Sequence, residues 1–106
     1  MIYSVDHRNG DFVNFAAAFA GRISTNCRAI DFSASGPASF GCRVVLRHES
    51  AEDRQQVAEA LEDFEAMRRP HYELPFQVAC EIVVSAEHIP HPASHELRLF
   101  RAREND

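Results

Sequence analysis

Residues 50–70, SAEDRQQVAEALEDFEAMRRP, constrain the fold most, because they carry the start, the buried face and the end of one long helix. Ser50 is a suitable N-cap, and Asp53 follows at the position where a capping box has its acidic or amide residue. Pro70 ends the pattern, since proline lacks an N–H and disfavours a helical residue before it. The apolar positions recur at helical spacing and predict one buried stripe: Val57, Leu61, Phe64 and Met67. We therefore predict a helix over residues 50–69.

The rest of the chain alternates short apolar runs with turn signals. A second helix is predicted over residues 12–20, because its Ala-Ala-Ala run loses no side-chain freedom in a helix, although a strand over residues 12–18 remains an alternative. The Asn-Gly pair in residues 6–10 predicts a polar turn before it. The remaining apolar runs have the alternation or composition of strands: residues 1–5, 27–33, 40–48, 76–85 and 96–103.

In chain order these elements give strand, helix, strand, strand, helix, strand and one extra strand. We therefore predict an α+β fold: a ferredoxin-like βαββαβ sandwich with an extra C-terminal strand, whose two helices cover one face of a mainly antiparallel sheet. The strand at 76–85 is then central or nearly so. A chain of 106 residues is expected to form one domain, 1–106, with a frayed tail at 104–106.

Composition and motifs narrow the class of protein. No apolar run reaches the length of a membrane span, and the N-terminus lacks the basic-then-apolar order of a secretory signal. Cys27, Cys42 and Cys80 form no CxxC pair and are interpreted as buried, reduced thiols, which favours a cytoplasmic protein. The chain has neither a P-loop nor a nucleophile elbow, so we expect no cofactor and favour a non-enzymatic protein. If the chain is an enzyme, the acid/base candidates are His48, His71 and Tyr72.

The charge pattern suggests where a partner would bind. The net charge is −5, and all eleven cations are arginine. Acidic residues concentrate on the helix at 50–69, and such a face suits a basic partner protein. The leading hypothesis is a small protein–protein interaction module (a regulator, adaptor or inhibitor) that acts through this face or through a sheet edge. The partner-binding candidates are Glu52, Glu59, Glu62, Asp63 and Glu65.

Two other functions fit the same sequence. A homodimeric α/β-barrel-type enzyme or binding domain would use the sheet face as a small-molecule pocket, and a deep apolar cavity over the sheet that contains His or Arg would favour it, whereas a filled, flat sheet face would not. A nucleic-acid-binding protein would use arginines of the strands and of the 6–10 turn, although the acidic total opposes this: Arg8, Arg28, Arg43, Arg47 and Arg98. A homodimer through a sheet edge or face is a further partner hypothesis, and no membrane partner is expected.

The loop at 86–95 holds three histidines, which are the commonest metal ligands. Their spacing matches no closed zinc pattern, and Pro90 and Pro92 extend the segment. We therefore predict no metal site, and name the possible ligands only as candidates: His88, His91 and His95.

Overall fold

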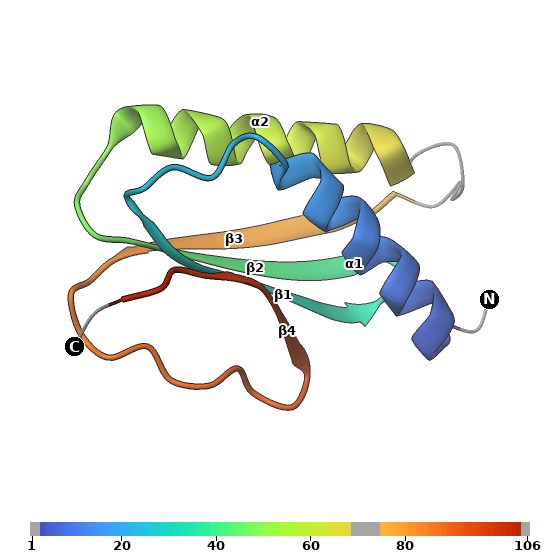
Figure 1. Ribbon diagram of the computed structural model, residues 1–106. Coiled ribbons are helices and arrows are strands. Elements are labelled where there is room, and N and C mark those ends of the chain that lie inside the picture. The colour runs from blue at the N-terminus through green and yellow to red at the C-terminus, as the bar shows by residue number, and fades with distance from the viewer. Residues whose placement is uncertain (1–2, 69–74, 105–106) are drawn as a thin grey trace.

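The computed structural model describes residues 3–68 and 75–104, which contain two helices and a four-stranded mixed sheet (Figure 1). The predicted α+β class is confirmed. The elements in chain order are α1 (Val5–Phe19), β1 (Cys27–Gly36), β2 (Ser39–Leu46), α2 (Ala51–Arg68), β3 (Gln77–Val84) and β4 (Glu96–Arg101).

The strand order across the sheet is β3-β2-β1-β4. β1 runs antiparallel to both β2 and β4, whereas β2 and β3 are parallel and are connected through α2. Both helices lie over the same face of the sheet, and a long connection runs from β3 beneath the opposite face to β4 (Figure 1). β3 therefore lies at an edge of the described sheet, and the prediction of a central position for this strand is wrong.

The predicted strand at 1–5 and the predicted turn at 6–10 are wrong wherever the structure describes them, because α1 already begins at Val5. The Oγ of Ser4 accepts a hydrogen bond from the backbone N–H of His7 at 3.2 Å, and the His7 ring accepts one from the Ser4 N–H at 3.1 Å. This is a capping box with histidine in place of the usual Glu or Gln, and it starts the helix earlier than the alanine run suggested. The predicted fold would place a strand at 1–5 between β2 and β3. In the structure these two strands pair directly with each other.

Phenylalanines join the helices to the sheet. Phe15 of α1, Phe32 of β1, Phe40 of β2 and Phe64 of α2 are each no more than 3% exposed. Their rings meet at centroid distances of 4.8–6.3 Å in tilted, stacked and edge-on pairs. The helix predicted at 12–20 is thus confirmed in type, and its phenylalanines face the core.

The predicted helix at 50–69 is confirmed over α2. Ser50 Oγ accepts from the backbone N–H of Asp53 at 3.1 Å, as the N-cap assignment requires. Val57 and Phe64 are buried, so the apolar stripe faces the sheet.

A buried ion pair joins the two helices. Arg68 Nε lies 2.9 Å from Asp11 Oδ1, and the two side chains are 0% and 1% exposed. Tyr3 donates its hydroxyl hydrogen to Asp11 Oδ2 at 2.6 Å. The guanidinium carbon of Arg68 lies 4.5 Å from the ring centroid of Phe40 and 4.6 Å from that of Phe76, so the charge is also held by aromatic faces.

Candidate functional site

The sheet face that the helices leave open carries a row of alternating charges. In the strand register, Glu81 of β3 is opposite Arg43 of β2, Arg43 is opposite Asp31 of β1, and Asp31 is opposite Arg98 of β4. Arg98 donates to both oxygens of Asp31, at 2.7 and 3.0 Å, and these side chains are 17% and 4% exposed. Opposite charges at facing positions stabilise strand pairing, so this row fixes the middle of the open face.

The rows on either side of the charges differ in character. On one side Val83, Val45 and Ala29 face one another across three strands; on the other side the equivalent positions are Ala79, Gly41 and Ser33. A Cβ at Gly41 would lie 2.5 Å from Ser33 Oγ, so a larger residue there would require the Ser33 hydroxyl to rotate away. The open face thus has an apolar end, a charged middle and an end made of small residues.

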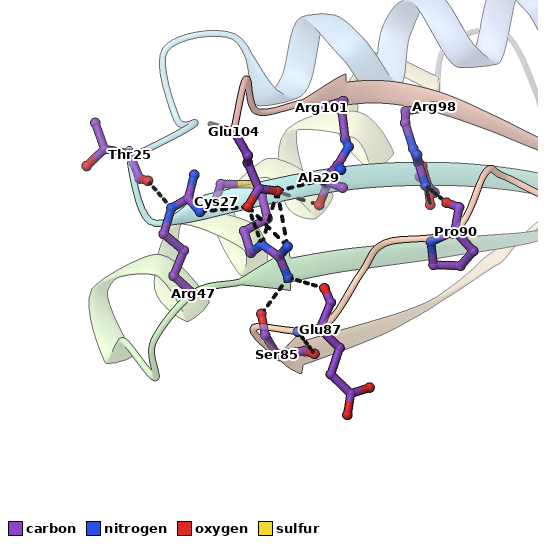
Figure 2. Close-up of polar contacts among 12 residues, drawn as sticks. Thr25, Cys27, Ala29, Arg47, Ser85, Glu87, Pro90, Arg98, Arg101 and Glu104 are labelled. Carbon is purple, nitrogen blue, oxygen red and sulfur yellow. Dashed lines mark hydrogen bonds and ion pairs between the residues drawn. The ribbon is translucent and has the colours of Figure 1, made fainter. Parts of the chain in front are cut away.

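Residues 85–95, which we call the arch, form a wall over the apolar end. Arg28 of β1 donates from Nη1 to the carbonyls of Ser85 and Glu87 at 2.7 and 2.8 Å, and Arg98 donates to the carbonyl of Pro90 at 2.9 Å (Figure 2). Ile89, only 8% exposed, packs with Ala29 and Val45 beneath it. The guanidinium groups of Arg28 and Arg98 therefore hold the backbone of the arch, and the Ile89 side chain anchors it on the sheet.

The segment after β4 completes this arrangement. The carboxylate of Glu104 accepts from Arg28 at 3.1–3.3 Å, from Arg47 at 3.2 Å and from Arg101 at 2.8 Å (Figure 2). The hydrogen bonds from Arg28 are the largest cause that holds the pKa of Glu104 below its usual value. The predicted frayed tail at 104–106 stays a prediction, and its residues 105–106 lie outside the described residues.

Two adjoining hollows lie on the open face. The larger has a volume of about 490 Å³ and lies between the arch and the sheet; apolar side chains of Val45, Val83 and Ile89 line it. The smaller, of about 340 Å³, lies over the small-residue end. Both are lined by Asp31, Arg43 and Glu96, so together they form one trough with a charged centre.

Arg43 is the accessible cation at the centre of this trough. Its side chain is 42% exposed, and its ion pairs are long, at 3.2 Å to Glu96 and 3.5 Å to Glu81. Arg98 and Asp31, in contrast, bind each other through two short hydrogen bonds. Arg43 is thus the planar donor best placed to meet a hydrogen-bond acceptor of a ligand, and Arg98 serves to position Asp31 and the arch.

The structure separates the arginines that were grouped by sequence. Arg43 and Arg98 line the trough, whereas Arg28 and Arg47 bind Glu104, and Arg8 lies in α1. Each of these four arginines, Arg28, Arg43, Arg47 and Arg98, has a carboxylate partner within 3.5 Å, which lowers the positive charge that they offer to a nucleic-acid backbone.

The histidines named as candidate metal ligands line the trough, whereas the acid/base candidate His48 lies outside it. His88 and His91 line the larger hollow, and His95 lines the smaller one. In the described part of the chain, no three His, Cys, Asp or Glu side chains gather closely enough to hold a metal ion. His48 is exposed and its backbone bonds to the Asn26 side chain. His71 and Tyr72 lie outside the described residues.

The acidic face of α2 is partly neutralised within the molecule. Arg22 binds Glu59 at 2.8 Å and Asp63 at 2.7 Å, and its hydrogen bond to Asp63 is the largest cause that raises the pKa of Arg22. Glu52, Glu62 and Glu65 are exposed. The partner-binding hypothesis for this face stays a prediction.

The sequence was compared with protein-family models and with curated proteins. The chain matches no protein-family model, and a search of curated proteins found no significant match. Within the described residues, neither helix is long and apolar enough to cross a membrane.

Proposed function

We propose that this chain is a binding domain for a small organic molecule, which it holds between the arch and the open sheet face. The observation that supports this most is the hollow of about 490 Å³, bounded by apolar side chains at one end and by Arg43 at the other. Ligand pockets commonly span about 300–1,000 Å³ and combine an apolar lining with a few polar groups. A hollow of this volume over the sheet supports the small-molecule hypothesis.

The lining suggests the form of the ligand. An apolar body would contact Val45, Val83 and Ile89, and a polar head would meet Arg43. Glu81 and Glu96 flank that guanidinium, so they would repel a carboxylate that approached it. A neutral acceptor, such as a hydroxyl or carbonyl oxygen, therefore suits Arg43 better than an anion does.

The other functions suggested by the sequence have less support from the described residues than small-molecule binding has. Arg22 reduces the free charge of the acidic helix, which weakens the case for a basic protein partner. A cytoplasmic location and a homodimer through the edge of β3 are compatible with the described fold, whereas the strand order differs from the ferredoxin-like arrangement that the sequence suggested.

Titration with three compounds of one shape tests the proposal: benzyl alcohol, benzoate and benzylamine, followed by backbone amide NMR shifts. We expect shifts that cluster at Val45, Val83 and the arch, with the tightest binding by the alcohol. Val83→Phe should fill the hollow and abolish these shifts. Val84→Phe is the matched control, because Val84 is the next residue, points to the other face of β3 and is 43% exposed. Shifts outside the trough, or equal binding by Val83→Phe, would refute the proposed site.

A further inference from the structure

Cys42 and Cys80 lie side by side on neighbouring strands. They are register partners in the parallel pairing of β2 and β3, and both side chains belong to the core on the helix side. Neighbouring strands are about 4.8 Å apart, and a disulfide needs Cα atoms about 4.4–6.8 Å apart with side chains that point the same way. Both cysteines are free thiols in this structure.

The two thiols differ in acidity. The interaction between the two thiols is the largest cause that lowers the pKa of Cys80, and the same interaction together with burial raises the pKa of Cys42. Cys80 is also the less buried of the two, since Cys42 is only 6% exposed. Because the thiolate is the nucleophile in thiol chemistry, Cys80 is the one suited to react first.

The surroundings allow the two sulfurs to approach and a reagent to reach them. β3 pairs only with β2 among the described strands, so its outer side places no restraint on a small movement toward β2. Cys80 is only half-buried and lies on the edge strand of the described sheet, so a small reagent can reach its thiol there. Cys27 lies on β1, and burial raises its pKa to about 11, so it is a poor nucleophile by comparison.

We propose that Cys42 and Cys80 are an oxidation site, at which hydrogen peroxide converts the two thiols into a disulfide that links β2 to β3. The Cys80 thiolate attacks one peroxide oxygen, the O–O bond breaks, and the departing hydroxide takes a proton to become water. The resulting Cys80 sulfenic acid is then attacked by the sulfur of Cys42. The S–O bond breaks, a second hydroxide leaves with the proton of Cys42 as water, and the S–S bond forms. Two electrons pass from the thiols to the peroxide, and a dithiol reductant reverses the change.

The test treats the reduced protein with an equimolar amount of hydrogen peroxide, alkylates the remaining thiols, and measures the intact mass and the linked peptides. We expect a product that has lost two hydrogens, one alkylated cysteine, a Cys42–Cys80 peptide, and full reversal by dithiothreitol. Cys27→Ser should form the same disulfide, whereas Cys42→Ser and Cys80→Ser should not.

The proposal is overturned by an unchanged mass, by a link that includes Cys27, by a disulfide between two copies of the chain, or by irreversible oxidation of Cys80 as the main product. Peptide mapping of the unaltered protein decides among these outcomes, so the result does not depend on the variants folding. The outcome is also independent of whether the trough binds a ligand.

Discussion

Replacement of Asp11 by alanine tests the energetic account of the core. Asp11 and Arg68 are both buried, and their ion pair is 2.9 Å long. Alanine removes the carboxylate that faces the guanidinium and also the acceptor of the Tyr3 hydroxyl. Because a charge taken from water needs its partner, removal of one member of a buried pair typically costs about 3–5 kcal/mol.

The expected loss is large enough to measure without ambiguity. For a domain of this size, 1 kcal/mol corresponds to about 4–8 °C in the melting temperature, so Asp11→Ala should lower it by roughly 15 °C or more. Thermal unfolding followed by far-ultraviolet circular dichroism measures this shift. The double variant Asp11→Leu with Arg68→Met should recover most of it, since well-packed apolar residues often replace a buried ion pair without loss.

An exposed ion pair provides the control. Glu49 lies 2.7 Å from Arg54, but both side chains are largely exposed, so Glu49→Ala should leave the melting temperature unchanged within error. A loss of only a few degrees for Asp11→Ala would refute the reasoning. So would a double variant that is no more stable than Asp11→Ala, because it would mean that the cost does not come from the loss of the Asp11 carboxylate beside Arg68.

Three further predictions concern the helix cap, the arch and the segment after β4. Ser50→Ala should destabilise the protein by about 1 kcal/mol, as measured by urea unfolding, because it removes the N-cap of α2. Ile89→Ala should cost about 2 kcal/mol and speed hydrogen exchange in residues 85–95, since it removes the apolar contact of the arch. Glu104 has a lowered pKa, so its contribution to stability is present above its ordinary value of 4.5 and is lost as the pH falls through the lowered value. Glu104→Gln should therefore make stability, measured by urea unfolding, less dependent on pH in the acidic range; an unaltered pH profile would contradict this assignment.

The sequence predicted well what depends on local pattern. The helix at 50–69 has a cap, a periodic stripe and a stop signal within one segment, and it forms almost as predicted. The strand at 40–48 likewise shows its alternation in the residues themselves. These elements need no distant contact to be recognised.

The error in the predicted topology began with one unusual residue in a capping box. His7 takes the place of Glu or Gln in the capping box of α1, so the start of that helix was interpreted as a turn. Removal of one strand then altered the neighbours of β3, because strand order depends on every strand in the sheet. A single local error thus changed the predicted topology.

The site depended on pairings that a single sequence does not reveal. Ile89 is one apolar residue in a polar loop, and nothing in its neighbourhood shows that it packs on Ala29 and Val45. Arg28 and Glu104 are separated by 76 residues, so their contact could not be inferred from spacing. Arg43 and Arg98 lie on one sheet face, but the hollow beside them also needs the arch, which distant contacts hold over the sheet.

The way in which arginine holds the arch has a consequence for its dynamics. Arg28 bonds at once to the start of the arch and to Glu104, and Arg98 bonds to both Pro90 and Asp31. Displacement of either guanidinium would therefore disturb the arch and an ion pair at the same time. Residues 85–104 should open as one cooperative unit, with similar opening free energies for their amides, and not by gradual fraying from one end. Access to the trough from beneath the arch would then be an all-or-none event, whose frequency is set by the stability of this unit.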